Sequence, residues 1–281
     1  MKRLLHFIEK YFIIFLLVII LIGGAFRFYN LTSNPPALNW DEVAIGYNAY
    51  SILKTGKDEF GKPFPVYFRS LNDYKRPVYI YATVGSIALF GFNDFAVRFP
   101  AAFFGTLTIV ALYFLTYELL KNRAIALVSA FLLAIVPWHI QFSRAAFEST
   151  LGLFLTACGV LFSLWGFRRN LWYLVLAALC FGLSLYSYLG QRVVVPILML
   201  TITVAYLPRA IKILKTKKAK NIIPLGLAVF IGIFFLISLY IDSKNPEGAI
   251  RYQATSIFTH SDEYAAAEKR MKYAGERKIN L

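Results

Sequence analysis

The stretch YFIIFLLVIILIGGAF, residues Tyr11–Phe26, contains no charged side chain and is bracketed by Lys10 and Arg27. About 20 apolar residues in a helix cross about 30 Å of hydrocarbon, a length that this stretch approaches together with its flanks. Six further apolar runs of the same kind follow along the chain: Phe99–Tyr117, Ala124–Ser143, Ser149–Phe167, Asn170–Gln191, Val193–Leu207 and Ile222–Ile241. The sequence therefore predicts an all-α polytopic membrane protein with about seven transmembrane helices.

The composition of the 281-residue chain agrees with this pattern, because 58% of its residues are hydrophobic and only 16% are charged. Soluble domains average roughly 45–50% apolar and about 25% charged residues, which excludes a disordered chain and an ordinary soluble enzyme. The formal net charge is +15. Most of the excess Lys and Arg lies in short loops between apolar runs, as in the cytoplasmic loops of membrane proteins, so we expect no nucleic-acid partner.

The distribution of basic residues predicts the orientation of the chain in the membrane. An eighth apolar run, Pro77–Asn93, would exchange the cytoplasmic and outer sides of every later loop if it crossed the membrane. Residues 209–220 contain six basic residues and no acid, and they face the cytoplasm only if this run does not cross. We therefore expect Pro77–Asn93 to be a juxtamembrane helix or a re-entrant segment at the outer interface. The N-terminus is then cytoplasmic, the C-terminus lies outside, and the protein resides in the plasma (inner) membrane.

The predicted organisation is a transmembrane domain over residues 1–241, followed by an outer loop or tail over residues 242–281 at which the chain is interpreted as truncated. The first outer loop, residues 30–98, is expected to contain juxtamembrane helices, one of them running through Ala44–Lys54 and ending at Gly56. The interiors of the spans hold essentially no ionisable residue, whereas ion-coupled transporters place acids there. The chemistry is therefore predicted at the outer surface of the membrane.

Asp41 and Glu42 form a pair of carboxylates that follows Trp40 in the first outer loop. Such a pair is suited to binding a cation or to acting as a general base. The alternative is an ordinary acidic pair in the first turn of a helix, with Asn39 or Asp41 as its cap, where the helix dipole favours negative charge.

Three further motifs stand at the predicted outer surface. Lys75-Arg76-Pro77 is a basic pair that suits a phosphate, and its alternative role is to anchor the chain at the interface. Ser143-Arg144-Ala145-Ala146-Phe147-Glu148 joins two spans, and its Arg and Glu are spaced to pair on a helix. Tyr186-Ser187-Tyr188 with Arg192 is either part of a substrate site or an aromatic belt with a flanking cation.

These motifs, in this order, resemble the GT-C membrane glycosyltransferases, and most closely the branch of protein O-mannosyltransferases and aminoarabinose transferases (PMT/ArnT-like). Arg98-Phe99-Pro100 also fits that pattern, and the resemblance extends over roughly residues 11–207. Two features depart from the family. Lys75-Arg76-Pro77 stands where the family usually has Lys-Pro-Pro or His-Pro-Pro, and family members are considerably longer, so the chain looks like the N-terminal part of such an enzyme.

The resemblance implies a glycosyltransferase that moves a sugar from a polyprenyl-phosphate donor to an acceptor hydroxyl or amine on the outer face, with inversion. The acceptor is a lipid, a polysaccharide or a protein, and the surrounding partners are membrane lipids. The implied roles are catalysis by the acids Asp41, Glu42 and Glu148, binding of the donor phosphate by Lys75, Arg76, Arg144 and Arg192, and lining of the substrate site by Trp40, Tyr186 and Tyr188. No cofactor is required, although a divalent cation (Mg or Mn) shared by Asp41 and Glu148 remains an alternative.

Two other functions are compatible with a polytopic chain. One is a membrane transporter or flippase, which the lack of charges within the spans disfavours. The other is a non-catalytic membrane scaffold, which is favoured if the chain is truncated after the last span. Neutralising the outer carboxylates abolishes transfer only if the chain is a transferase.

Overall fold

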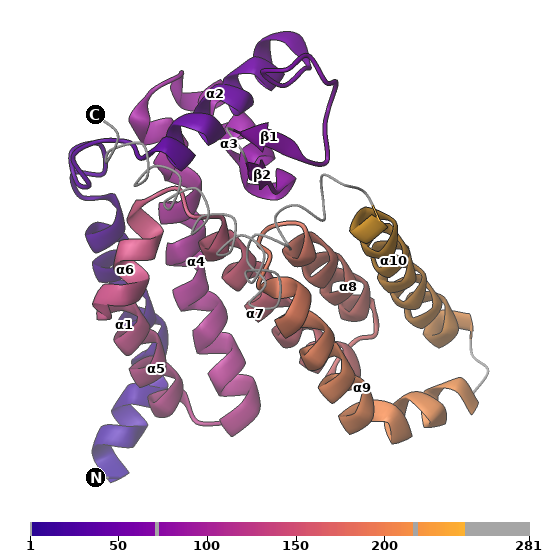
Figure 1. The fold of residues 1–281 in the computed structure, drawn as a ribbon. Coiled ribbons are helices and arrows are strands. Elements are labelled where there is room, and N and C mark those ends of the chain that lie inside the picture. Colours follow the sequence, from indigo (N-terminus) through magenta and orange to yellow (C-terminus); the bar gives the residue numbers. More distant parts are fainter. Residues whose placement is uncertain (1, 71–72, 216–218, 245–281) are drawn as a thin grey trace, which may run out of the picture.

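The computed structural model describes residues 2–70, 73–215 and 219–244, and the C-terminal part of the predicted tail lies outside these ranges. The described residues form helices α1 (Lys2–Phe28), α2 (Trp40–Thr55), α3 (Pro77–Phe90), α4 (Asp94–Leu120), α5 (Arg123–Ile135), α6 (Pro137–Arg144), α7 (Glu148–Arg168), α8 (Trp172–Leu185), α9 (Gln191–Lys215) and α10 (Ala219–Lys244), with strands β1 (Phe68–Ser70) and β2 (Asp73–Lys75). In Figure 1 the long helices form a bundle, and α2, α3 and the strands lie across one end of it. We call this end the covered end.

The described helices confirm an all-α integral membrane protein but not the number of seven spans. Five helical stretches are long and apolar enough to cross a membrane: Glu9–Phe28, Asp94–Leu120, Glu148–Arg168, Gln191–Lys215 and Ile222–Asp242. A sixth span results if α5 and α6, which are bent by 56° at their junction, are counted together. The remaining predicted span, Asn170–Gln191, contains only the 14-residue helix α8, because turns beginning at Tyr186 end the helix early.

Local sequence signals explain the first helix at the covered end. The side chain of Asn39 accepts a hydrogen bond from the backbone N–H of Glu42, and the Glu42 carboxylate accepts one from the backbone N–H of Asn39. Gly56 ends α2 with a φ of 70°, a left-handed conformation that glycine adopts without strain. The helix predicted through Ala44–Lys54 is thereby confirmed.

A small hairpin, which the sequence analysis did not predict, follows α2. Strands β1 and β2 pair antiparallel, with Phe68 opposite Lys75. Pro77 is the first residue of α3, a position that suits proline because its missing N–H has no helical partner there. Lys75 therefore ends a paired strand, and Arg76 links this strand directly to the start of α3.

A hydrophobic core attaches the covered end to the bundle. Buried side chains from α2, α3, α4 and α7 meet Phe68 of β1 in one cluster, which includes Ile45, Ala49, Tyr79, Ile80, Ala101 and Leu151. A second cluster joins α1, α4 and α5 through Leu16, Ile19, Ile109, Tyr113 and Ala130. Burial of this apolar surface stabilises the position of α2 relative to α4 and α7. Polar side chains carried by these elements consequently have fixed places.

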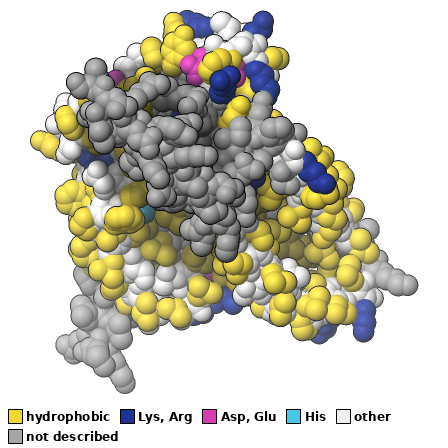
Figure 2. All heavy atoms as spheres, in the orientation of Figure 1, with side chains coloured by type: hydrophobic (Ala, Val, Ile, Leu, Met, Phe, Trp, Pro, Cys, Tyr) yellow, Lys and Arg dark blue, Asp and Glu magenta, His cyan; other side chains and the backbone are white. Residues whose placement is uncertain are grey.

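The sides of the bundle are apolar. Figure 2 shows hydrophobic side chains spread over the faces of the long helices. On α9 and α10 the exposed large side chains include Ile197, Val204, Phe230 and Phe234. Apolar surface of this extent is unusual for a soluble protein and is the surface that lipid covers in a membrane.

Gly105 allows α4 and α6 to pack closely, and this contact gives a first prediction. A Cβ atom at position 105 would lie 2.6 Å from the Cβ of Ser143, a fully buried residue. We expect Gly105→Ala to lower the free energy of unfolding by about 1–3 kcal/mol, because the two helices must move apart. Thermal unfolding of the purified protein in detergent measures the change. Gly226→Ala is the matched control, since its new methyl group meets no described atom within 4 Å, and an equal loss there contradicts the packing argument.

Candidate functional site

A polar cleft at the covered end brings together side chains from four separate segments. It has a volume of about 70 Å³. Asp41 of α2 and Lys75 of β2 line it, together with residues 146–149 at the start of α7 and Tyr188 from the turn between α8 and α9. Of the residues predicted from the sequence, the structure thus places Asp41, Lys75, Glu148 and Tyr188 around one space.

Asp41 and Lys75 form the charged pair of this cleft. The ammonium group of Lys75 donates a hydrogen bond to Oδ1 of Asp41 and forms an ion pair with it. The side chain of Lys75 is only 3% exposed, whereas that of Asp41 is 53% exposed. The carboxylate is therefore anchored on one side by a buried cation and remains accessible on the other.

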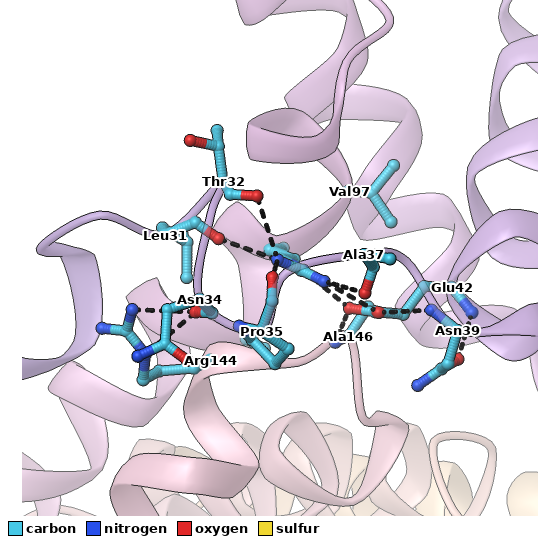
Figure 3. Close-up of polar contacts among 12 residues, drawn as sticks. Leu31, Thr32, Asn34, Pro35, Ala37, Asn39, Glu42, Val97, Arg144 and Ala146 are labelled. Atoms are coloured by element: carbon cyan, nitrogen blue, oxygen red, sulfur yellow. Dashed lines mark hydrogen bonds and ion pairs between the residues drawn. The ribbon is translucent and has the colours of Figure 1, made fainter.

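Glu42, the second acid of the pair, is directed into the protein instead of into the cleft. Its carboxylate accepts hydrogen bonds from Nε of Arg98 at 3.0 Å, from Nη2 of Arg98 at 3.2 Å, and from the backbone N–H of Ala146 at 2.9 Å. Arg98 is fully buried and also donates to the carbonyl groups of Leu31, Thr32, Pro35 and Ala37 (Figure 3). Glu42 and Arg98 thus fasten the loop between α1 and α2, and the first turn of α2 with Asp41, to α4 and to the segment before α7.

Arg144, a predicted phosphate ligand, supports the same loop. Its Nη1 donates to the carbonyl of Phe26 at 2.7 Å, and its Nη2 donates to the carbonyl of Asn30 at 3.2 Å. Nη2 also donates to the carbonyl of Asn34 at 2.8 Å (Figure 3). Arg144 ends α6 and Glu148 begins α7, so the two residues are not one turn apart on a single helix. The structure places the Arg144 guanidinium against backbone carbonyl groups.

Two other predicted phosphate ligands, Arg76 and Arg192, meet at Tyr67. The Tyr67 ring lies 4.7 Å from the Arg76 guanidinium, and its hydroxyl accepts a hydrogen bond from Nη2 of Arg192 at 3.0 Å. The same nitrogen lies 3.7 Å from the carboxylate of Asp242 on α10. Burial, and next the nearby Asp242 carboxylate, raises the pKa of Tyr67, which is therefore a neutral phenol at pH 7.

The two remaining predicted residues lie elsewhere. Trp40 is largely exposed at the start of α2 and is not among the residues that line the cleft. Tyr186 lines a second, mostly apolar groove of about 380 Å³, whose walls include Phe64, Pro65, Val66, Val78, Leu183 and Phe235. Pro77 also lines this groove, so only Arg76 separates it in sequence from the cleft residue Lys75. The polar cleft and the apolar groove are thus neighbours along the chain.

The cleft has few ligands for a metal ion. In residues 2–70, 73–215 and 219–244 no group of three or more His, Cys, Asp or Glu side chains is placed to hold one. The cleft offers two carboxylates, Asp41 and Glu148, and the first already faces the Lys75 ammonium group. Such a pair suits Mg²⁺ only where a substrate phosphate supplies further oxygen ligands.

Sequence reasoning did not assign a role to Arg98 or Tyr67. Arg98 had a signal, because a charge in an apolar helical run must be paired within the protein. Tyr67 had none, since its partners are 9 and 125 residues away in the chain and only the fold brings them together.

The helical membrane bundle, with charged side chains gathered at its covered end, has the fold of the GT-C membrane glycosyltransferases. Residues 74–235, more than half of the chain, match the family of dolichyl-phosphate-mannose-protein mannosyltransferases, and the chain belongs to this family. The resemblance to the PMT/ArnT-like enzymes is thereby confirmed. No curated protein matches the chain in sequence.

Solved structures of an oligosaccharyltransferase from Archaeoglobus fulgidus share the fold. The apo form has a TM-score of 0.55 and 19% identity, with coverage of 90% of this chain and 37% of that chain. The complex of the enzyme, AglB, with an inhibitory peptide and a dolichol-phosphate has a TM-score of 0.54 and 19% identity, with coverage of 87% and 36%. A form tethered to an acceptor peptide containing the NVT sequon has a TM-score of 0.54 and 16% identity, with coverage of 98% and 39%. The chain therefore spans well under half the length of these enzymes.

Proposed function

We propose that this chain carries the reaction site of a membrane glycosyltransferase that uses a polyprenyl-phosphate sugar as its donor on the outer face of the plasma membrane. The acceptor oxygen or nitrogen forms a bond to the anomeric carbon while the bond from that carbon to the lipid phosphate breaks. The acceptor proton passes to Asp41, and the phosphate leaves with the bonding electrons. Attack opposite the leaving group inverts the anomeric configuration.

The observation that carries this proposal is the pairing of an accessible Asp41 with a buried Lys75 in one cleft. A carboxylate in reach of the acceptor acts as a general base. Once Asp41 accepts the proton it loses its charge, and its attraction for the Lys75 ammonium group falls. Lys75 is then available to the negative charge that grows on the leaving phosphate. Glu148, across the same cleft, orients the acceptor.

The guanidinium groups of Arg76 and Arg192 supply further positive charge for the leaving phosphate. Arg76 lies over the ring of Tyr67 and Arg192 donates to its hydroxyl, so one tyrosine holds both groups, and Arg76 directly follows the cleft residue Lys75 in the chain. Donors fixed before the reaction stabilise developing charge without having to reorganise. The adjacent apolar groove of about 380 Å³ suits the first isoprene units of the donor lipid.

A divalent cation, if one takes part, would be held by Asp41 and Glu148 and would neutralise charge on the donor phosphate. The ammonium group of Lys75 already occupies one side of Asp41, and this competes with a cation at that carboxylate. The proposed roles of Asp41, Lys75 and Glu148 therefore rest on these side chains alone.

Membranes that contain the protein test the proposal when they are supplied with a polyprenyl-phosphate sugar labelled in the sugar. We expect label in the acceptor fraction, release of polyprenyl phosphate, and an inverted anomeric centre by NMR. Retention of configuration contradicts the proposed mechanism. Movement of intact donor across the membrane without bond cleavage supports the transporter alternative, and absence of both supports a scaffold.

Tyr67→Phe is expected to weaken donor use without removing the base. The substitution keeps the ring beside Arg76 but takes the hydrogen-bond acceptor from Arg192. A hydrogen bond to a charged group contributes about 1.5–3 kcal/mol. Because water can replace part of this contact, we expect a roughly tenfold rise in the donor KM. Steady-state kinetics at varied donor concentration measure this change. Tyr47→Phe is the matched control, because Tyr47 is an exposed tyrosine of α2 that lines neither the cleft nor the apolar groove. An equal rise there contradicts the special position of Tyr67.

A further inference from the structure

A cluster of charged residues lies at the end of the bundle away from α2 and α3, where α4 meets α5 and α7 meets α8 (Figure 1). Its centre is Glu118, which is 1% exposed. Three cations contact this one carboxylate: Lys121 at 2.6 Å, Arg168 at 2.9 Å and Arg169 at 2.9 Å. Arg168 also donates to the backbone carbonyl of Glu118 at 2.6 Å.

The cluster keeps an excess of positive charge that faces outward. One carboxylate neutralises one of the three cations, and the side chains of Arg168 and Arg169 remain 32% and 52% exposed. Within the part of the chain that the structure describes, Nη2 of Arg168 and both Nε and Nη1 of Arg169 donate to no protein acceptor. Guanidinium groups held in this way present fixed donors to an anion.

Other contacts hold the two arginines in position. The Arg169 guanidinium lies 4.8 Å from the ring of Trp165, and Nε of Arg168 donates to the hydroxyl of Tyr206 on α9 at 3.1 Å. Ordering these side chains in advance lowers the entropic cost of binding. A carboxylate, an indole ring and a phenol thus orient two cations that a solvated loop would leave disordered.

The surroundings of the cluster are those of a membrane interface. Leu119 and Leu120 at the end of α4 and Trp172 at the start of α8 are exposed apolar side chains next to the charged groups. Tryptophan at a helix end is typical of the level of lipid headgroups. A lipid whose anionic headgroup reaches the cluster can therefore place its acyl chains against these apolar side chains.

We infer that this cluster, named here the Glu118 cluster, binds the phosphate headgroup of an anionic membrane lipid. Phosphate oxygens accept hydrogen bonds from the outward nitrogens of Arg168 and Arg169, and Lys121 adds charge. The acyl chains lie against the exposed apolar side chains at the ends of α4 and α8. This site is at the opposite end of the bundle from the cleft of Asp41 and does not depend on the proposed transferase function.

Native mass spectrometry of the full chain, released from detergent after addition of phosphatidylglycerol or phosphatidylcholine, tests the inference. We expect phosphatidylglycerol to remain bound and phosphatidylcholine, whose phosphate charge is balanced by choline, to dissociate. Arg169→Gln removes one exposed cation and is expected to lower the apparent affinity for phosphatidylglycerol roughly tenfold. The triple variant Glu118→Gln, Arg168→Gln and Arg169→Gln is expected to lose the preference for the anionic lipid without leaving a buried carboxylate unpaired.

The matched control is the double variant Lys212→Gln and Lys215→Gln. It removes two cations from the last turn of α9 but none from the Glu118 cluster. It is expected to retain the parent affinity. Equal binding of both lipids by the parent, or an equal loss in the control, overturns the inference. Inorganic phosphate is a third arm, and full displacement of phosphatidylglycerol by millimolar phosphate overturns the assignment to a lipid headgroup.

Discussion

Asp41→Asn is expected to abolish most sugar transfer, with a fall in kcat of about 10²–10⁴-fold, because the substitution keeps the shape of the side chain and removes the general base. Lys75 remains in the cleft and the second carboxylate, Glu148, is unchanged. Binding of the donor lipid should therefore stay close to that of the parent. Sugar transfer and donor binding, measured on the same membranes, separate the loss of the base from a loss of binding.

Asp94→Asn is the control for this result. Asp94 is another exposed aspartate in the first turn of a helix, α4, and it lies outside the cleft. Its substitution should leave transfer unchanged. Parent-like transfer by Asp41→Asn would show that the acidic pair only begins a helix, and equal losses at both positions would point to a general effect of helix-end charge.

Arg98→Met is expected to have the largest effect on stability, a loss of about 3–5 kcal/mol. The substitution leaves the buried carboxylate of Glu42 without its charged partner and takes donors from the carbonyl groups of Leu31, Pro35 and Ala37. The connection between α1 and α2 should consequently open before the rest of the bundle. Limited proteolysis within residues 29–39, together with thermal unfolding in detergent, measures both effects.

The double variant Glu42→Gln with Arg98→Met separates this ion pair from general damage to the core. It contains no unpaired buried charge, so its loss of stability should be smaller than the sum of the two single losses by about 0.5–3 kcal/mol, the range found for contacting residues. Strictly additive losses would contradict a direct pairing. Glu42→Gln alone should lower transfer only as far as it lowers the folded fraction.

The sequence predicted the membrane fold and much of the cleft because both depend on local patterns. Apolar runs mark helices, and the segment from Asn39 to Gly56 marks the ends of α2 through its cap and its glycine. Polarity at the ends of apolar runs and the resemblance to a family point to Asp41, Lys75, Glu148 and Tyr188, and the structure gathers these residues in one cleft. Their chemical roles remain a proposal.

The parts that the sequence did not predict depend on contacts between distant segments. Nothing in the pair Asp41-Glu42 indicates that one carboxylate is exposed and the other buried, since this follows from the position of Arg98 on α4. The role of Arg144 likewise depends on carbonyl groups at the end of α1 and in the turns that follow it, more than 100 residues earlier in the chain. The number of seven spans is not confirmed within the described residues, because an apolar run does not show where a helix such as α8 stops.

The bond between Glu42 and Arg98 also sets an order of events during synthesis. The two residues are 56 positions apart, so at about 5–20 residues per second the carboxylate emerges roughly 3–11 s before its partner. The backbone N–H of Ala146, 104 positions after Glu42, arrives later still. Until Arg98 of α4 has left the ribosome, the loop between α1 and α2 lacks the side chain that fastens it. A nascent chain stalled before Arg98 should therefore be cut readily in this loop by protease on the side of the membrane that the loop has reached.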